Sequence, residues 1–439
     1  MTDLQIGLSL IAGMVALIAV GLQIGIALVL LSLVGVWLIK DNFELALKLI
    51  ALASYSGIQD YLFATIPLFV LMGLLVSISD VGKDTFEVAE ALLKRVRGGV
   101  AMATVAANAL FAAVTGISIA SAAVFTKVAV PEMVRHGYTK RWAVGTVAGS
   151  SILGMLIPPS LLMIIYGVLS EQSIGKLFIS GAIPGVIIAT GFIVMIYAVA
   201  TLKPHLVFER GNSDKAIDGP PLGSRELLVK LVPILSLVAL VLGGLYAGFL
   251  TPTEAGGVGA FGAFLIALAR RRLNAAKLWR VLKETGYVSV SILFLLIAAG
   301  LYSRVLSLAG VPNAIADLVR DLGLGSYGFL LFYVAILLML GMILDSSSIL
   351  LIMVPIGVPI AQAFNFDLIH FGVITVIAVE CGLLTPPFGI SVFTVKATLD
   401  DPSIKLETIF AGSMPYFYVM LGALVLVALV PWFSLALVR

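Results

Sequence analysis

Charged residues are scarce in this sequence. Asp, Glu, Lys and Arg make up only 12% of its 439 residues, against about 25% in a soluble domain. The net charge of +3 is too small to indicate a nucleic-acid partner. The single cysteine, Cys381, excludes an intrachain disulfide and a cysteine-ligated metal site. The three scattered histidines argue against a histidine-built metal site or a histidine-based catalytic centre; they are His136, His205 and His370.

Apolar residues fill most of the chain instead. Hydrophobic residues account for 61% of it and the mean hydropathy is +1.14, which predicts an all-α integral membrane protein. A span needs about 20 apolar residues. The expected spans are 5–20, 23–39, 61–79, 141–168, 182–202, 229–249, 254–269, 285–303, 369–395 and 409–437. No basic segment precedes 5–20, so it is expected to be a first span and not a cleaved signal peptide.

Two further apolar stretches, 98–134 and 326–363, each contain a polar break, at 115–118 and at 345–348. We expect each stretch to form two short helices that enter and leave the membrane on one side, as a re-entrant hairpin. The alternative is a single kinked span whose Ser and Thr side chains bond back to the helix. Two more segments mix charge with apolar residues and are expected to be amphipathic helices at the interface, 42–58 and 84–97.

The lysines and arginines predict the orientation, because cytoplasmic loops carry the excess of both. Most of the 27 fall on one side if both termini lie outside the cytoplasm, the first hairpin opens inward and the second opens outward. Segment 203–228, rich in charge, Gly and Pro, is then a cytoplasmic linker.

An internal repeat supports this topology. The sequence GMLIPP at 154–159 matches GLLTPP at 382–387, an offset of 228, and Ser118 and Ser346 share that offset. The repeats would cover 1–202 and 229–439. Each half has an odd number of crossings, so the second would be inserted upside down. Inverted repeats are a recurrent architecture of secondary transporters.

The two Pro-Pro pairs predict broken helices within the spans at 141–168 and 369–395. Proline removes an N–H group and clashes with the carbonyl four residues back, so main-chain oxygens become available to a hard cation such as Na⁺. Each hairpin break would add hydroxyls, giving two ion sites that flank one substrate site. The predicted ion-site residues are Thr115, Gly116, Ser118, Gly154, Pro158, Pro159, Asp345, Ser346, Ser347, Gly382, Thr385, Pro386 and Pro387.

Helix N-termini beyond the breaks offer N–H donors to an anion. The residues expected to bind substrate are Ser121, Ser160, Ser348, Phe388 and Gly389. The alternative for all of these positions is a set of structural kinks packed against neighbours.

Three intramembrane acids have separate interpretations. Glu254 follows Thr251 and Pro252 in a helix-capping pattern. Asp345 either caps the returning helix of the second hairpin or faces an ion. Glu380 either orients the unwound segment from outside the ion site or pairs with Lys127. The sequence contains no Walker A motif and no hydrolase constellation, so an enzyme is not expected.

These segments together resemble the large membrane subunit of tripartite ATP-independent periplasmic (TRAP) transporters. The matching stretches include PEMVRHGY at 131–138, GMLIPPS at 154–160, GFLTPTEA at 248–255, DSSSILLIMVP at 345–355 and GLLTPPFG at 382–389. The first hairpin tip departs from the family in having fewer hydroxyls. Backbone carbonyls are therefore expected to supply more of the ion ligands there.

The resemblance implies an elevator-type mechanism and Na⁺-coupled uptake of an organic acid across a bacterial or archaeal inner membrane. It also implies two partners, a small four-helix membrane subunit and a periplasmic solute-binding protein. One alternative is a stand-alone anion:cation symporter of related architecture that needs no binding protein. Another is a channel or a structural membrane scaffold, against which the two broken helices argue.

Overall fold

The computed structural model describes residues 1–209, 223–399 and 401–438, and every regular element in this part of the chain is a helix. It contains no strand; Tyr138 and Phe208 form one isolated antiparallel bridge. The middle of the linker expected at 203–228 lies outside the described residues.

The first part of the chain, up to the linker, forms one short 3₁₀ helix and twelve α-helices. They are α1 (Asp3–Ala19), α2 (Ile24–Lys40), α3 (Phe43–Gln59), η1 (Tyr61–Ala64), α4 (Thr65–Ile78), α5 (Val81–Leu93), α6 (Gly99–Thr115), α7 (Ser118–Arg135), α8 (Lys140–Ser151), α9 (Leu153–Leu156), α10 (Leu161–Ser170), α11 (Ile174–Leu202) and α12 (Pro204–Val207).

The second part, from residue 223 on, follows with the remaining helices. They are α13 (Ser224–Val238), the π-helical turn η2 (Ala239–Gly243), α14 (Gly244–Tyr246), α15 (Pro252–Ala269), α16 (Ala275–Leu308), α17 (Val311–Asp321), α18 (Gly325–Gly341), α19 (Ser346–Ala363), α20 (Leu368–Gly382), α21 (Ile390–Thr398), α22 (Leu406–Leu429) and α23 (Trp432–Leu435).

Long apolar helices make this a multi-pass membrane protein. By length and composition, eight helices of the described residues can cross a bilayer, or nine if the bent pair α17–α18 counts as one span. Helices α1 and α2 have 17 residues each, about 25 Å at 1.5 Å per residue. Two spans are longer than the sequence predicts, because the side chains of Ser173 and Asn274 cap α11 and α16 at earlier starts.

Both polar breaks separate a pair of helices. Gly116 has a left-handed backbone (φ 62°) and Ile117 is extended, so α6 ends and α7 begins there. The rings of Phe111 and Phe125 then lie 5.6 Å apart across the pair, which shows that the chain doubles back. In the second stretch, Phe329 of α18 stacks on Phe364, just beyond α19, at the same distance. Each stretch is therefore an antiparallel helix pair and not one kinked helix. That the pairs re-enter the membrane stays a prediction.

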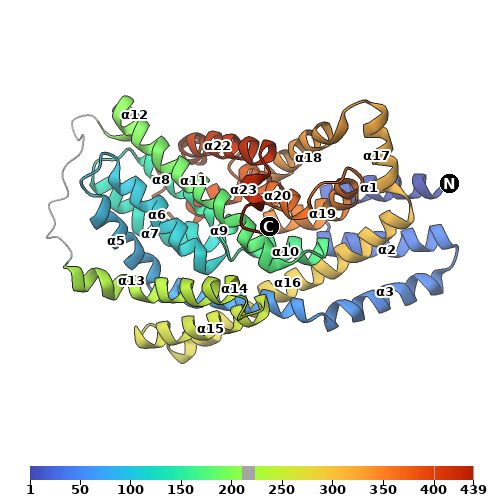
Figure 1. Cartoon of the computed structure of the whole chain (residues 1–439), viewed down its shortest axis with the longest axis horizontal. Coiled ribbons are helices and arrows are strands. Elements are labelled where there is room, and N and C mark those ends of the chain that lie inside the picture. The colour runs from blue at the N-terminus through green and yellow to red at the C-terminus, as the bar shows by residue number, and fades with distance from the viewer. Residues whose placement is uncertain (210–222, 400, 439) are drawn as a thin grey trace.

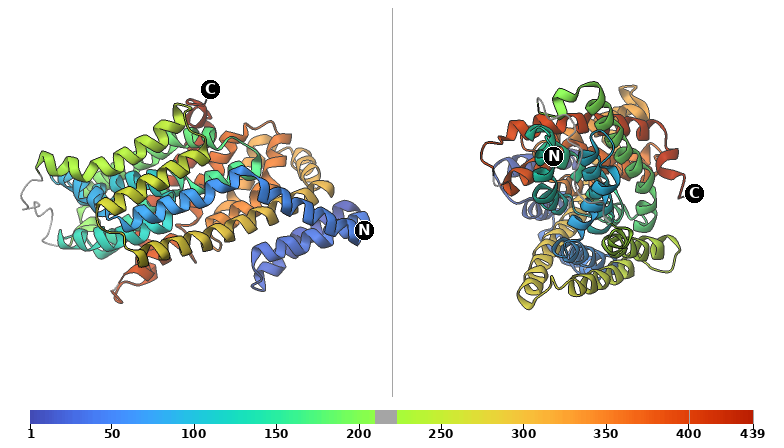
Figure 2. Two further views of the ribbon diagram at one scale, coloured as in Figure 1. Left: turned by 90° about the horizontal axis from the view of Figure 1, so that it is seen from below. Right: turned by 90° about the vertical axis from the view of Figure 1, so that its left-hand side faces the viewer.

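The helices fall into two packed groups. In the scaffold group, α15 lies along α4, α16 packs on α2, α3 and α4, and α13 packs on α15. In the hairpin group, α6–α10 pack with one another and with α19–α22. Figure 1 shows α3, α13 and α15 along its lower edge, and α6–α9, α18 and α22 above them. The two further views in Figure 2 show the long helices of the scaffold group covering one flank of the molecule.

Glycine allows the closest helix contact within the hairpin group. A Cβ on Gly145 of α8 would lie 2.1 Å from the carbonyl carbon of Gly412 in α22. The two backbones therefore meet without side chains between them, which is the packing that small residues permit in membrane helices. This contact joins the first broken helix to a helix near the end of the chain.

Candidate functional site

The tip of the first hairpin packs directly on the first Pro-Pro break. A Cβ on Gly116 would lie 2.6 Å from the carbonyl oxygen of Pro159, and one on Gly154 would lie 3.0 Å from Cα of Ser118. The N–H of Leu161, the first residue of α10, donates to the Gly116 carbonyl at 3.3 Å. The structure thus brings together all six ion-site residues expected in the first half. We call this contact, residues 115–118 against 154–160, the first junction.

The first break exposes main-chain oxygens inside the protein. Residues 158–160 are buried and residue 157 is half-buried. No hydrogen bond from the described residues reaches the carbonyl oxygens of Ile157, Pro158 or Pro159. Buried carbonyl oxygens nearly always have a partner. This group of oxygens is therefore suited to bind a cation or a hydrogen-bond donor.

The second hairpin packs on the second break in the same way. A Cβ on Gly341 would lie 2.6 Å from Cα of Gly382, and the N–H of Phe388 donates to the Met342 carbonyl at 3.1 Å. The hydroxyl of Ser346 donates to Oε1 of Glu380 at 2.7 Å. We call the contact of 341–348 with 380–389 the second junction. The residues predicted for the second ion site lie in it.

The two breaks differ in exposure. Pro158 and Pro159 are buried, whereas Pro386, Pro387 and Phe388 are exposed; Phe388 retains 55% of its accessible surface. Both Pro-Pro peptide bonds are cis. Carbonyl oxygens of residues 383–388 receive no hydrogen bond from the described residues. The chemistry of the two breaks is therefore alike, but only the first is enclosed by protein.

Several predicted hydroxyl ligands have local partners. Thr115 donates to the Phe111 carbonyl at 3.0 Å, and Thr385 donates to the Gly382 carbonyl at 2.5 Å. Ser160 caps α10 by accepting from the Met163 N–H. The carboxylate of Asp345 caps α19 and accepts from both the N–H and the hydroxyl of Ser348. Of the two roles expected for Asp345, the structure shows the cap. The hydroxyls of Ser118 and Ser347 make no hydrogen bond to the described residues.

Glu380 and Lys127 do not form the pair that was one of two roles considered for Glu380. Lys127 is exposed on α7 and lines a different pocket, while Glu380 is fully buried on α20 and accepts from Ser346. Its second oxygen, Oε2, has no hydrogen-bond partner among the described residues. Glu380 thus contacts the second hairpin tip directly. The cap predicted for Glu254 is confirmed, because Thr251 and Glu254 form a reciprocal capping box.

The sequence analysis missed a buried polar chain beside the first junction. Ser121 donates to Oδ1 of Asn108 at 2.7 Å, and the Asn108 amide donates to Ser150 at 2.7 Å. Ser150 donates to the carbonyl of Thr146, whose hydroxyl contacts Tyr416. The chain fixes α6 and α7 to α8 and α22. Ser121 therefore points into this network. The four-residue spacing of Thr146 and Ser150 places both hydroxyls on one face of α8, and this spacing could have indicated the network from the sequence.

Two helix N-termini near the junctions have no side-chain cap, those of α7 and α21. The two helices pack together, and the second half of α7, from Lys127 to Arg135, lines one pocket with Thr398, the last residue of α21. They consequently run in the same direction, with Ser118 and Ile390 at the same end. Uncapped N–H groups and two aligned helix dipoles favour an anion there.

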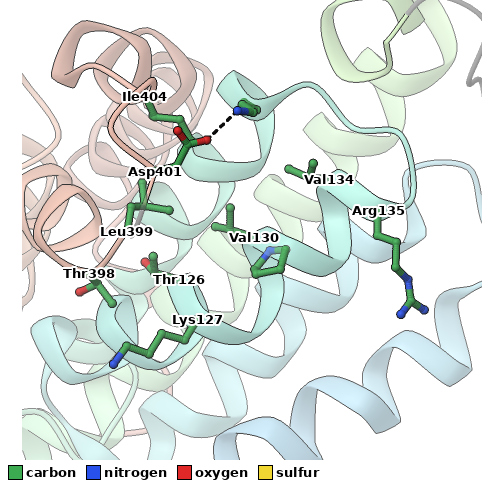
Figure 3. Close-up of a pocket in the computed structure, with 11 residues that line it drawn as sticks. Thr126, Lys127, Val130, Val134, Arg135, Thr398, Leu399, Asp401 and Ile404 are labelled. Atoms are coloured by element: carbon green, nitrogen blue, oxygen red, sulfur yellow. Dashed lines mark hydrogen bonds and ion pairs between the residues drawn. The ribbon is translucent and has the colours of Figure 1, made fainter.

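The pocket at the other end of these helices has a volume of about 690 Å³ and is lined by α7, Lys140, Thr398, Leu399, Asp401 and Ile404 (Figure 3). Lys140 donates to Asp401 at 2.6 Å and to Ser403 at 3.1 Å. Bonds from Lys140 and Ser403 hold the pKa of the Asp401 carboxyl well below its usual range. Arg135 points away from this ion pair in Figure 3.

Two hairpins pack on two broken helices, and the sequence that forms them matches a known family. The family model described as "Tripartite ATP-independent periplasmic transporter, DctM component" matches residues 11–433. The chain belongs to this family. It is a transporter permease component and not an enzyme.

Relatives extend over nearly the whole chain. The C4-dicarboxylate TRAP transporter large permease protein DctM of Pseudomonas aeruginosa is 35% identical over 396 residues, which cover 89% of this chain and 90% of the relative. The sialic acid TRAP transporter large permease protein SiaM of Vibrio cholerae is 28% identical, with 97% of both chains covered.

A solved transporter has a similar fold. The YdaH transporter of Alcanivorax borkumensis superposes with a TM-score of 0.59 at 15% identity and covers 89% of each chain. At this identity the likeness concerns the fold alone.

Proposed function

We propose that this permease couples the inward movement of Na⁺ to uptake of a carboxylate substrate, which a periplasmic binding protein delivers. The observation that carries the proposal is the matched construction of the two junctions. Each joins a hairpin tip to a Pro-Pro break, and each presents main-chain carbonyl oxygens that no described residue pairs. Unwound carbonyls of broken helices coordinate Na⁺ in secondary transporters.

Each junction would hold one Na⁺. At the first, the donors would be the carbonyls around Pro158 and Pro159 with those of Thr115 and Gly116 and the Ser118 hydroxyl. At the second, they would come from residues 382–387, with Ser346 and Ser347 on the facing tip. Every donor is an oxygen, and the buried carboxyl group of Glu380 lies beside the second set. This donor set fits a small hard cation.

The substrate carboxylate would bind between the two junctions, at the uncapped N-termini of α7 and α21. The N–H groups of Gly389 and the residues after it begin α21, and the exposed ring of Phe388 lies beside them. Relatives whose names specify C4-dicarboxylates and sialic acid support this class of ligand, since both kinds of molecule carry carboxylate groups.

Transport would proceed by movement of the hairpin group against the scaffold group. An inverted repeat of 1–202 and 229–439, with the hairpins open to opposite sides, supplies two related end states. Helices α7 and α19 begin 228 residues apart, as do α8 and α20, in keeping with the offset of the repeat. The protein would lie in the inner membrane with both termini in the periplasm, and the small membrane subunit would dock on the scaffold group.

Uptake into proteoliposomes tests the proposal. The permease is reconstituted with its small subunit, and the binding protein and a radiolabelled C4-dicarboxylate or sialic acid are added outside. An inward Na⁺ gradient should drive accumulation, and omission of the binding protein should abolish it.

Two outcomes would contradict the proposal. Uptake driven by a pH gradient in Na⁺-free buffer would overturn the ion assignment. Na⁺-driven uptake by the permease without a binding protein would instead support the alternative of a stand-alone symporter.

A further inference from the structure

Three side chains that bind metals converge on the side of the hairpin group that faces α5. Glu132 and His136 lie four residues apart at the end of α7 and therefore share one face. Glu90 approaches them from α5, 42 positions earlier in the sequence. Because Glu90 is so far from the other two residues in the sequence, the sequence alone does not indicate that the three side chains meet.

The distances among the three suit one cation. Nε2 of His136 lies 3.1 Å from Oε1 of Glu132 and 3.6 Å from Oε1 of Glu90, and all three ligand atoms fall within 4.8 Å of one another. In a tetrahedral site with bonds of about 2.1 Å, ligand atoms are about 3.4 Å apart. The cluster thus needs only a small adjustment to close around a metal ion.

Negative charge in the cluster is incompletely balanced. The side chains of Glu90, Glu132 and His136 are only 15%, 23% and 11% exposed. Oε1 of Glu90 is buried and accepts no hydrogen bond from the part of the chain that the structure describes, while Arg135 pairs with Glu132 at 2.9 Å. Burial raises the pKa of Glu90 to about 7, and the nearby Glu132 adds to the rise. A divalent cation would compensate both carboxylates at once.

We propose that Glu90, Glu132 and His136 form a binding site for a divalent transition-metal cation, which ties α5 to the last turn of α7. One imidazole and two carboxylates suit Zn²⁺, Co²⁺, Mn²⁺ and Fe²⁺, and a fourth position remains for water. The site lies outside both junctions and is independent of the Na⁺ assignment. A bound ion would join an amphipathic helix, α5, to the first hairpin.

Metal titration of the purified full-length chain tests the site. Zn²⁺ added to chelator-treated protein should bind saturably at one ion per chain by calorimetry, and it should raise the melting temperature. Glu90→Gln and His136→Ala should each weaken binding at least tenfold and remove the thermal shift. Co²⁺ should produce visible absorption bands in the native protein that His136→Ala abolishes.

Matched substitutions control for nonspecific binding. His205→Ala removes an exposed histidine and Glu44→Gln an exposed glutamate, so both should bind Zn²⁺ as the native chain does. Glu90→Gln should fold, because it removes one of two adjacent carboxylates, and its melt without metal verifies this. Unchanged Zn²⁺ affinity in folded Glu90→Gln and His136→Ala, or no saturable binding by the native chain, would overturn the proposal.

Discussion

Pro386 and Pro387 hold open the second break, and we expect their replacement to uncouple the protein from Na⁺. The double substitution Pro386→Ala with Pro387→Ala restores two N–H groups and should let the helix close around carbonyls that now have no partner. Stability should not fall, since an interior proline costs a helix roughly 3 kcal/mol. Initial uptake rate against Na⁺ concentration, with a thermal melt as a folding check, measures the effect.

Thr385→Ala is the matched control for that variant. It removes one hydroxyl, whose net contribution is about 0.5–1.5 kcal/mol, so Na⁺ dependence should weaken by a smaller factor. The corresponding pair Pro158→Ala with Pro159→Ala should also lose Na⁺ coupling. These two prolines lie in the enclosed break, which packs against Gly116. Their replacement can therefore affect folding, and a thermal melt of this variant must be measured separately. Normal Na⁺ dependence in the folded Pro386/Pro387 variant would show that the break is only a packing kink.

Glu380 is expected to stabilise the second hairpin tip through Ser346. Glu380→Ala leaves a buried hydroxyl without its acceptor and should lower the free energy of unfolding by about 1–3 kcal/mol. Glu380→Gln keeps an acceptor oxygen and should cost less. Thermal or chemical denaturation of both variants, of Ser346→Ala and of the double alanine variant gives a mutant cycle. A cycle in which the two alanine effects simply add would refute the interaction.

At the residue scale, the sequence predicts features that depend on local backbone chemistry. The breaks at Gly116 and at the two Pro-Pro pairs, and the Thr251–Glu254 capping box, arise from residues that are close in the chain. The Asn108 chain and the Glu90–His136 contact depend on which helix faces which, and no local pattern specifies that. The sequence left two roles open for Glu380 for the same reason, and of these the pair with Lys127 does not form.

Neighbouring helices approach each other most closely at glycines. We expect any larger residue at these positions to disrupt the contact. Gly382→Ala would place a Cβ 2.9 Å from Cα of Gly341 and should destabilise the protein by about 1–3 kcal/mol through overpacking, with loss of transport. Gly422→Ala is the control, because nothing lies within 4 Å of its Cβ position. Melts and uptake assays on both variants test this, and equal behaviour of the two would exclude a tight contact at the second junction.

The direction of each hairpin is testable by cysteine labelling. Arg95 and Arg135 are exposed at the two open ends of the first hairpin, and Tyr327 and Asn365 at those of the second. Single cysteines at the first two should react with an impermeant maleimide only from the cytoplasm, and at the last two only from the periplasm. The natural Cys381 is buried, so background should be low. Opposite-side labelling within one hairpin would disprove re-entry and the inverted repeat with it.

At the element scale, most helix positions follow from apolar length, but several starts do not. Helix α11 begins at Ile174 because Ser173 caps it, eight residues before the span predicted at 182–202. Helix α16 likewise extends through a charged segment after its cap, Asn274. Hydropathy locates the part of a helix that lies in lipid, whereas the cap determines where the helix itself begins.

At the scale of the molecule, relative movement of the two groups is expected to be essential for transport. Gln23 before α2 and Ser348 of α19 line one pocket of about 450 Å³ between scaffold and hairpin. A reducible crosslink between cysteines at these positions should stop uptake, and reduction should restore it. A crosslink between cysteines at Thr126 and Thr398, both within the hairpin group, should leave uptake nearly unchanged. Full transport with the first crosslink in place would exclude the elevator mechanism.

The unequal exposure of the two breaks has a kinetic consequence. Pro386–Phe388 are exposed at the surface of this subunit, while Pro158–Ser160 are enclosed. Where the exposed face of the second break opens to water, an ion reaches this break by diffusion alone, but it enters the first break only when the surrounding side chains move aside. Two sites of similar intrinsic affinity would then fill and empty at different speeds, so the sequence of arrivals would be fixed by access and not by binding strength. Isotope exchange of ²²Na⁺ would consequently show two phases, with the slow phase belonging to the enclosed site.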